Sequence, residues 1–303
     1  MNIIKPKSLK AGDTISIIAP SGQPVIGKVL RGKDYLESKG YKVKLGKHLE
    51  QADRYLSASD DNRLEDLHEA FSDEDTNAII CARGGYGALR LIDKIDYELI
   101  RNNPKIFCGY SDITILNAFF YKKSGLITFS APMIQGDFAQ ECIDEFTEQK
   151  FFSTLQDNSF ELNSFNYESY GNIDKAEGIL YGGNLSTLAS LAGTDFIPDE
   201  KFMLFAEDLN EPVYKIDRYF TQLFNIQKFR DKISALILGD FIGIEEEYKK
   251  DLDALFAEIA KWHNIPVIKT FPISHSKQKG TIPVGAFAHL DNGLISAKNY
   301  LTI

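Results

Sequence analysis

The chain has 303 residues, of which 44% are hydrophobic and 25% charged, and its formal net charge is −9. This length predicts one large domain or two smaller ones, with the composition of a globular protein. The negative charge argues against a nucleic-acid-binding protein, which needs a basic surface. The N-terminal segment has no long apolar stretch followed by a small-residue cleavage site. We therefore expect no signal peptide, no membrane-spanning helix and a cytoplasmic location.

The three cysteines, Cys81, Cys108 and Cys142, are widely spaced. An odd number with this spacing predicts neither a disulfide framework nor a zinc site. Cys81 and Cys108 each lie in an apolar segment, which predicts buried thiols. The sequence also lacks H-E-x-x-H and any Cys/His cluster, so we expect no metal and no other cofactor.

The first half of the chain alternates short apolar segments with amphipathic ones. Strands that alternate with helices pair in parallel, and this pattern predicts a doubly wound sheet. The predicted strands are 14–19, 41–45, 77–82 and 105–109, and the predicted helices are 25–39, 60–71 and the segment after Ser111.

The sequence changes character near residue 140, where it becomes polar and rich in aromatic residues. We expect a helix and then a connecting crossover over 141–170, followed by a second, mixed α/β domain. The predicted boundaries are 1–150 for the first domain, 151–174 for a linker and 175–303 for the second domain. Its predicted strands are 176–183, 201–208, 233–241, 265–272, 280–292 and 294–299, and its predicted helices are 214–229 and 248–263.

Ser111 lies between an apolar segment and a helix-like one, in PKIFCGYSDITILNAFF at 104–120. One interpretation is a helix N-cap, whose hydroxyl accepts a hydrogen bond from the first turn. The other is a nucleophile held at a tight turn, where the helix N-terminus offers N–H groups to a developing oxyanion. The pattern is not G-x-S-x-G, because residue 113 is Ile, so both interpretations stay open.

A glycine-rich segment, RGGYG at 83–87, also follows a predicted strand. Phosphate binding fits poorly, because the segment has neither the Lys-Ser/Thr of a P-loop nor the G-x-G-x-x-G spacing. Alternatively, Gly84 and Gly85 allow a backbone that points an N–H into a cleft at the carboxyl edge of the sheet, where open α/β sheets bind ligands. A plain strand-to-helix turn is the third interpretation.

A serine nucleophile needs a base and an acid. Of the five histidines, His275 follows a predicted strand and lies in a Ser/Lys/Gly loop, which makes it the best candidate base. The others are His48 in a polar loop, His68 on a charged helix face, His263 at a helix end and His289 in the last β-rich segment.

The candidate acids lie at and just after the end of the apolar strand in FMLFAEDLNEP, 202–212. They are Glu207, Asp208 and Glu211, and the residues themselves do not choose among the three. The order Ser, acid, His along the chain is allowed, since triads are defined by geometry.

Taken together, these segments resemble the LD-carboxypeptidases, which are serine peptidases that trim muropeptides in bacteria. The resemblance covers nearly the whole chain and rests on the order and spacing of its segments. These are LKAGDTISIIAPSG, ARGGYGALRLIDKIDYELI, KIFCGYSDIT, the APM at 131–133, GILYGGNLSTLASLAGT, LFAEDLNEPVYKIDR and ISHSKQKGTIPVGAFAHLD.

The resemblance implies a Ser–His–Glu triad of Ser111, His275 and Glu207, with an oxyanion hole made by the N–H groups of Gly85 and Asp112. It also implies a flavodoxin-like or Rossmann-like N-terminal domain that carries the nucleophile, and a smaller C-terminal α/β domain that carries the acid and base. Family members are commonly homodimers. They often have Gly directly before the histidine, where this chain has Ser274, which puts the geometry of that loop in doubt.

The implied substrate is the cytoplasmic tetrapeptide of recycled peptidoglycan, cut between the L-centre of its diamino acid and terminal D-Ala. Arg83 is a candidate for the substrate carboxylate, and Asn184 and Glu211 are candidates for positions near the cleft. A rival is the related microcin C self-immunity peptidase, which cleaves an aminoacyl-nucleotide conjugate and would need aromatic groups to stack the base. Trp262 is the single tryptophan, and we expect it in the core, which favours the muropeptide. A non-catalytic small-molecule binding protein is the third possibility.

Overall fold

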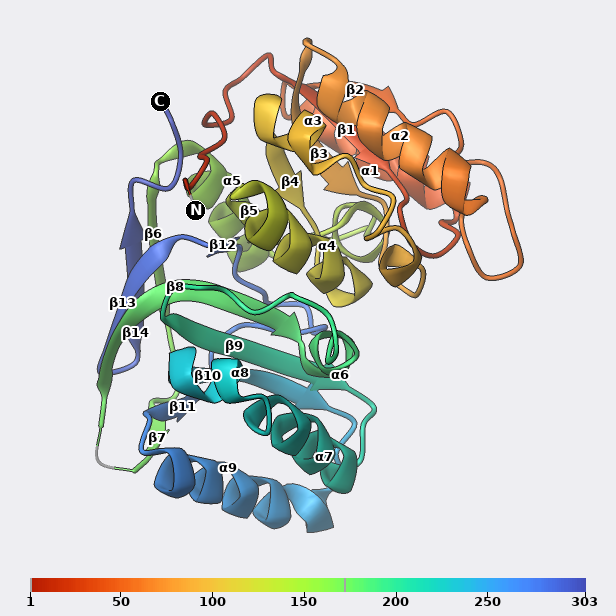
Figure 1. Ribbon diagram of the computed structural model, residues 1–303. Coiled ribbons are helices and arrows are strands. Elements are labelled where there is room, and N and C mark those ends of the chain that lie inside the picture. The colour runs from red at the N-terminus through yellow and green to blue at the C-terminus, as the bar shows by residue number, and fades with distance from the viewer. Residues whose placement is uncertain (1, 172) are drawn as a thin grey trace.

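Two β-sheets organise the residues that the computed structural model describes, 2–171 and 173–303 (Figure 1). The first sheet has the order β12-β5-β4-β3-β1-β2, and all of its pairs are parallel except the antiparallel pair of β12 and β5. The order 2-1-3-4-5 is that of flavodoxin-like folds, which confirms the fold class predicted for the N-terminal part of the chain. Its strands are β1 (Thr14–Ile18), β2 (Lys42–Leu45), β3 (Thr76–Cys81), β4 (Ile106–Cys108), β5 (Thr128–Ser130) and β12 (Ile282–Val284).

The helices of this domain follow the amphipathic segments of the sequence. Ser59 caps the N-terminus of α2, where its side chain accepts a hydrogen bond from the N–H of Asn62, and α1 ends before Gly40 at φ +91°. The elements are α1 (Ile26–Ser38), α2 (Asp60–Ser72), α3 (Tyr97–Asn102), α4 (Thr114–Phe119), α5 (Glu145–Gln156), the 3₁₀ helices η1 (Ala88–Arg90) and η2 (Ser111–Ile113), and the π-helices η3 (Phe120–Ser124) and η4 (Ile134–Phe138).

The second sheet has eight strands in the order β6-β14-β13-β8-β9-β10-β11-β7. Its centre, β8 to β11, is parallel, and antiparallel strands flank it on both sides. Its strands are β6 (Ser159–Asn163), β7 (Glu168–Tyr170), β8 (Lys175–Asn184), β9 (Phe202–Leu209), β10 (Ile233–Ile242), β11 (Val267–Lys269), β13 (Phe287–Asp291) and β14 (Leu294–Lys298). Its helices are α6 (Leu185–Ala189), α7 (Val213–Phe224), α8 (Gln227–Lys232), η5 (Glu246–Tyr248) and α9 (Lys249–His263).

The structure differs from the sequence-based elements in several places. The segment 151–174, predicted as a linker, contains the end of α5 and the strands β6 and β7, which both pair with strands of the second sheet. The predicted helix 214–229 divides into α7 and α8, because Ile226 has an extended backbone between them. The predicted strand 280–292 is two strands in different sheets. Trp262, predicted in the core, is 65% exposed, since it lies on the outer side of α9.

The change of sheet between β12 and β13 occurs at Gly285. Its φ is +91°, and its N–H donates to the carbonyl of Leu180 on β8 at 2.7 Å. An ideal Cβ at this position would be 2.1 Å from Cδ2 of Tyr121, which is buried. Only glycine combines this backbone conformation with so close a neighbour. The C-terminal segment therefore adds a strand to the first sheet and then returns to the second.

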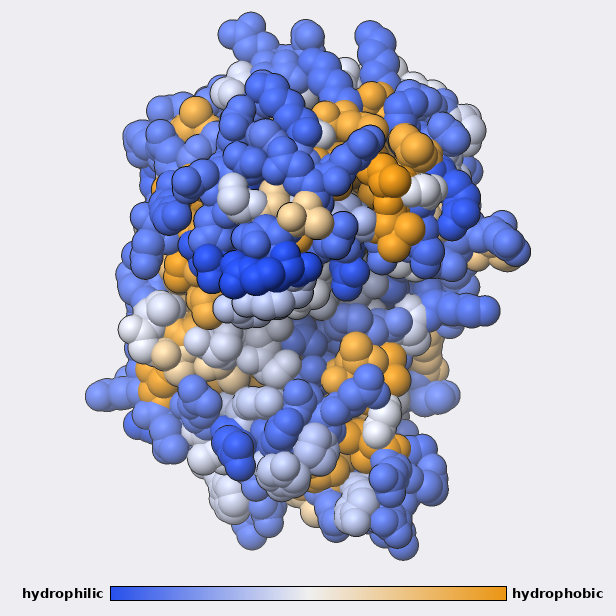
Figure 2. All heavy atoms as spheres, turned by 90° about the vertical axis from the view of Figure 1, so that its right-hand side faces the viewer, coloured by the Kyte–Doolittle hydropathy of each residue, from blue (hydrophilic) through white to orange (hydrophobic). Residues whose placement is uncertain are grey.

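The two sheets lie one above the other in Figure 1, with α4 of the first domain next to β8 and α6, and with α7 and α9 on the far side of the second sheet. Lys122 of the first domain contacts the carboxylates of Asp195 and Asp199 across this interface, at 3.4 and 3.1 Å. Figure 2 shows one side of both domains, where hydrophilic side chains cover most of the surface. Over the described residues, no helix is both long and apolar enough to span a membrane.

Replacing Gly285 with Ala should destabilise the fold. The new methyl group would overlap the Tyr121 ring, and overpacking of this kind costs about 1–3 kcal/mol beyond the backbone strain. Gly40→Ala is the matched control, because Gly40 also has φ +91° but its ideal Cβ has no atom within 4 Å. Urea unfolding midpoints measure both effects. Equal losses in the two variants would contradict the packing argument.

Candidate active site

Three turns meet at the carboxyl edge of the first sheet. They follow β1 at Ser21-Gly22, β3 at 83–87 and β4 at 110–112. The N–H of Gly22 donates to the carbonyl of Gly84 at 3.1 Å, and the hydroxyl of Ser21 donates to the carboxylate of Asp112 at 2.6 Å. This edge is where open α/β sheets bind their ligands. The glycine-rich segment and the Ser111 turn, which are far apart in sequence, are therefore direct neighbours.

Ser111 has φ +61°, a left-handed conformation that is strained for a residue with a side chain. It is the first residue of η2, whose N-cap is Tyr110, and no side-chain hydrogen bond caps this helix. The Ser111 side chain therefore does not cap this helix, although the sequence left that role open. A serine in a strained turn between a strand and a helix is the arrangement that exposes a nucleophilic hydroxyl in hydrolases.

The glycines of the RGGYG segment let its backbone approach Ser111 closely. An ideal Cβ on Gly84 would be 2.9 Å from Ser111 Oγ and 3.3 Å from the nitrogen of Asp112. Gly85 is exposed and has φ +109°, a conformation that glycine adopts freely. The predicted oxyanion donors, the N–H groups of Gly85 and Asp112, thus belong to two segments in contact beside the same hydroxyl.

The side chain of Asp112 is buried beneath this turn. Its carboxylate accepts hydrogen bonds from the Ser21 hydroxyl at 2.6 Å and from the N–H of Ala88 at 2.9 Å. Burial raises the pKa of the Asp112 carboxyl above its ordinary value, although these hydrogen bonds favour the ionised form. The carboxylate thus ties the three turns together, and the first-turn N–H of Asp112 has no acceptor within the helix.

Arg63 of α2 is a further buried support for these turns, with 1% of its surface exposed. Its guanidinium donates to the carbonyls of Pro20 and Gly87, the latter at 3.0 Å, and to the carboxylate of Asp60 at 2.6 Å. The planar guanidinium holds its five N–H donors in a rigid arrangement, whereas the ammonium group of a lysine is a compact charge with three rotatable donors. It connects the turn after β1 to the end of the RGGYG segment.

The second domain supplies a histidine–carboxylate pair. Glu207 is near the end of β9, and its Oε2 lies 2.7 Å from Nδ1 of His275, which follows β11. The Glu207 side chain is 4% exposed and the His275 side chain 17% exposed. The side-chain amide of Asn184 donates to the other carboxylate oxygen at 3.3 Å. A carboxylate that accepts from Nδ1–H leaves Nε2 of the imidazole free to take a proton.

The other two carboxylates of the strand-end segment have different partners. Asp208 accepts from the side chain of Asn184 at 2.9 Å and from the N–H of Ser186 at 2.7 Å, so it stabilises the start of α6. Glu211 forms an ion pair with Lys215 at 3.2 Å. Arg83, the candidate for a substrate carboxylate, donates to the backbone carbonyls of Gln23 and Gly84.

Tyr110 joins the two halves of the site. It directly precedes Ser111, and its ring packs edge-on against the His275 imidazole with 5.0 Å between the ring centroids. Lys279 donates to the Tyr110 hydroxyl at 3.1 Å and lies 4.4 Å from the centre of its ring. Burial, together with the nearby carboxylates of Asp137 and Glu207, raises the pKa of Tyr110 well above its ordinary value. Tyr110 is therefore neutral, and its ring connects the Ser111 turn with His275.

Lys279 also forms a buried ion pair with Asp137 of η4 at 2.6 Å, and each side chain is 6% exposed. The hydroxyl of Thr147 on α5 holds the same loop, because it donates to the carbonyl of Lys277 at 2.8 Å and accepts from the N–H of Lys279 at 3.0 Å. The sequence analysis did not identify these contacts. A single lysine in a polar loop and a single aspartate 142 residues away have no local pattern that connects them.

The remaining histidines lie in other environments. His48 contacts Glu65 at 3.2 Å, His68 accepts from the N–H of Asp96 at 3.0 Å, and His263 stacks on the ring of Phe224. His289 is on β13, with its side chain 61% exposed. Among the described residues, no group of three or more His, Cys, Asp or Glu side chains could hold a metal ion.

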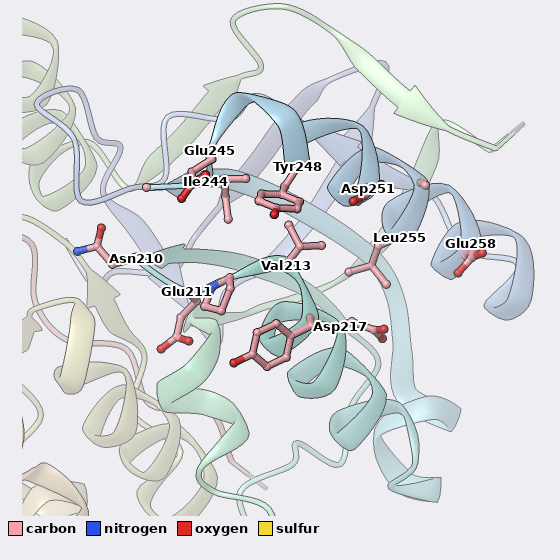
Figure 3. Close-up of a pocket in the computed structure, with 14 residues that line it drawn as sticks. Asn210, Glu211, Val213, Asp217, Ile244, Glu245, Tyr248, Asp251, Leu255 and Glu258 are labelled. Atoms are coloured by element: carbon pink, nitrogen blue, oxygen red, sulfur yellow. The ribbon is translucent and has the colours of Figure 1, made fainter.

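Two large cavities lie on the molecule, and one of them is beside His275. One, of about 760 Å³, is lined by Tyr110, by His275 and by basic residues of α1 and the His275 loop. The other, of about 720 Å³, lies between α7 and α9, beyond the end of β9. Figure 3 shows this second cavity, with Asn210 and Glu211 at one end and Glu258 at the other, and with carboxylates along both helices. The two cavities therefore differ in charge.

Comparison with known proteins places these features in a family. The LD-carboxypeptidase N-terminal domain matches residues 15–131, and the LD-carboxypeptidase C-terminal domain matches residues 177–290. A probable murein peptide carboxypeptidase of Bacillus subtilis (strain 168) is 38% identical over 295 residues, which covers 95% of this chain and 91% of that protein.

Solved structures agree over the same length. The crystal structure of muramoyltetrapeptide carboxypeptidase from Oxalobacter formigenes has a TM-score of 0.87 and 32% identity, covering 95% of this chain and 100% of that one. The microcin C7 self-immunity protein MccF, in an inactive mutant apo state, has a TM-score of 0.89 and 28% identity, covering 98% of this chain and 99% of that one. Both halves of the chain, and their arrangement, show that it belongs to the LD-carboxypeptidase family of peptidases.

Proposed function

We propose that this protein is a serine-type LD-carboxypeptidase that releases terminal D-Ala from murein tetrapeptide during cytoplasmic peptidoglycan recycling. The observation that carries the proposal is the convergence of two elements. The hydrogen-bonded pair of Glu207 and His275, at 2.7 Å, packs through Tyr110 against the strained turn of Ser111. Two of the relatives described above are named for activity on murein or muramoyl peptides, which supports the same substrate class.

The first half of the reaction forms an acyl-enzyme. Ser111 Oγ attacks the carbonyl carbon of the L-to-D peptide bond while Nε2 of His275 takes the hydroxyl proton. The carbon–nitrogen bond then breaks, and the imidazolium gives that proton to the amine of the departing D-Ala. Glu207 keeps the imidazole in the required tautomer and stabilises its charged form. In the second half, water attacks the ester, again with His275 as base, and releases Ser111.

The tetrahedral intermediate carries a negative oxygen in each half. The N–H groups of Gly85 and Asp112 are the proposed donors to this oxygen. The first comes from the RGGYG segment and the second from the Ser111 turn. Backbone donors held by Arg63 and by the Asp112 carboxylate need little rearrangement when the charge develops. One well-placed donor of this kind contributes about 3 kcal/mol to lowering the barrier.

The ion pair of Asp137 and Lys279 has a positioning role in this scheme. It lies between the domains and holds Tyr110, which contacts both the nucleophile turn and the base. Replacing one member of a buried pair leaves an uncompensated charge, whereas removing both charges together is often tolerated. The pair can therefore be tested separately for its effects on stability and on catalysis.

A second candidate function is that of the microcin C self-immunity peptidases, since MccF shares the fold at a TM-score of 0.89. Such an enzyme needs an aromatic surface for a nucleobase. Trp262 is exposed, but it precedes the amino end of β11, whereas Glu207 is near the carboxyl end of the parallel strand β9. The tryptophan thus belongs to the opposite edge of the sheet from the acid and supplies no aromatic surface beside it.

Ser111→Ala should abolish D-Ala release from purified tetrapeptide. Loss of a triad nucleophile lowers the rate by roughly 10⁶, because the three members act as a unit. Mass spectrometry of the products measures the loss. Ser72→Ala is the control, because Ser72 is exposed at the end of α2, where its hydroxyl contacts only the carbonyl of Glu69. Full activity in Ser111→Ala would exclude the nucleophile, and no release by the unaltered protein would exclude the substrate.

Glu207→Gln should lower kcat by about 10⁴, because an amide can donate to the imidazole and so favours the wrong tautomer. Glu211→Gln, in the same segment but paired with Lys215, should change kcat by less than about tenfold. Steady-state kinetics on the tetrapeptide compares the two. The opposite ranking would assign the acid to Glu211.

Lys279→Met should destabilise the protein by about 3–5 kcal/mol, because it leaves the Asp137 charge buried and unpaired. The double variant Lys279→Met/Asp137→Asn should recover most of that stability in urea unfolding. Its kcat should nevertheless stay roughly tenfold low, because Tyr110 has lost its partner beside His275. Recovery of both stability and kcat in the double variant would reduce the pair to a purely structural role.

A further inference from the structure

The cavity of about 760 Å³ beside His275 lies where the two domains meet. Its walls come from α1, from the nucleophile turn at Tyr110, from residues 136–144, from Thr147 of α5 and from the loop 275–279. The volume falls within the roughly 300–1,000 Å³ typical of small-molecule sites. Because both Tyr110 and His275 form part of its wall, a molecule in this cavity lies beside the candidate base and next to the residue that precedes Ser111.

The charges around this cavity favour an anion. Four of the lining residues are basic, Lys28, Arg31, Lys277 and Lys279, and three are acidic, Asp137, Glu141 and Asp144. The charges of Lys279 and Asp137 cancel in the buried ion pair, which leaves three basic residues and the two carboxylates of Glu141 and Asp144. The Asp144 carboxylate accepts from the N–H of Thr147 at the start of α5.

The other three basic residues are available to a ligand. Within the described part of the chain, Lys28, Arg31 and Lys277 form no ion pair with a carboxylate. The Arg31 Nε donates to the carbonyl of Ala139 at 3.3 Å, which leaves the terminal nitrogens of its guanidinium to face a ligand. The hydroxyl of Thr147 donates to the carbonyl of Lys277, which fixes the backbone at Lys277 two residues after His275.

The second cavity has the opposite character. Its lining residues include the carboxylates of Glu211, Asp217, Glu245, Asp251 and Glu258 and no lysine or arginine (Figure 3). A carboxylate would be repelled there, since like charges raise the energy of binding. Of the two large cavities, the one that His275 lines is therefore the one suited to an anionic group.

The direction of proton transfer decides which part of a peptide lies in it. In the proposed reaction His275 gives its proton to the departing amine, so the departing residue must lie on the imidazole side of the cleaved bond. In a carboxypeptidase the departing residue carries the free α-carboxylate. We infer that the basic cavity is the leaving-residue subsite, where Lys28, Arg31 and Lys277 bind the C-terminal carboxylate of the peptide. This inference rests on the proposed function and adds the groups that make the enzyme an exopeptidase.

Binding to an inactive protein tests the subsite. In the Ser111→Ala background, calorimetry gives Kd for the tetrapeptide and for the same peptide with a C-terminal carboxamide. The added substitutions Arg31→Gln and Lys277→Gln should raise Kd for the acid by about 10- to 100-fold, the loss expected for hydrogen bonds between charged groups. The Kd for the amide should change less than about twofold, because the amide offers no charge to these residues. Lys261→Gln, on the exposed last turn of α9, is the control and should change neither value.

Equal weakening of both peptides by the double substitution would overturn the subsite, because it would indicate a general structural effect. No change in either Kd value would overturn it as well, since the ratio of the two values would again stay the same. The proposed function is judged separately, by D-Ala release from the unaltered protein. Release together with an unchanged ratio removes only the subsite, whereas absence of both release and binding removes the function and the inference together.

Discussion

The buried contact of Lys279 with Asp137 and Tyr110 is the interaction on which the candidate site depends. Ser111 is on the first domain, and the candidate acid and base, Glu207 and His275, are on the second, so no local segment can align them. Lys279 reaches across with a 2.6 Å ion pair and a 3.1 Å hydrogen bond, at a place where both charges are nearly inaccessible to solvent. A buried pair contributes little net stability, but separating its members leaves uncompensated buried charges, so arrangements of the two domains that part Lys279 from Asp137 are disfavoured.

The course of the chain strengthens this alignment. His275 lies between β11 in the second sheet and β12 in the first, so the loop that carries the base is attached to both sheets within a few residues. Thr147 clamps the middle of the loop, and Gly285 returns the chain to the second sheet. A base held at both ends keeps its orientation without relying on a single side-chain contact. Such pre-organisation is what general base catalysis needs.

In the first domain, the candidate site depends on a strained backbone turn at Ser111. Ser111 is held at φ +61°, and the glycine at 84 leaves room for its hydroxyl. The strain is compatible with a stable fold because Arg63 and Asp112 tie the surrounding turns together with buried, charged hydrogen bonds. The two adjoining cavities then divide by charge, one basic beside His275 and one acidic beyond β9. In the proposed function, a peptide carboxylate would therefore bind on the His275 side.

The sequence by itself determined the α/β class and the parallel first sheet. Apolar segments alternate with amphipathic helices there. The spacing of apolar residues in a helix or a strand is set by local backbone geometry, so it can be recognised in the sequence. It also placed Ser111, Gly85, Glu207 and His275 at the ends of strands, because parallel strands deliver such residues to one edge. Periodicity could not assign β12 to the first sheet or β6 and β7 to the second, since pairing partners far apart leave no local pattern. The residues themselves left the strand-end carboxylate open, the resemblance implied Glu207, and the tertiary structure places Glu207 against His275. Only the tertiary structure decided that Lys279 joins Asp137 and that Lys28, Arg31 and Lys277 share one cavity with His275, because each of these depends on which distant segments pack together.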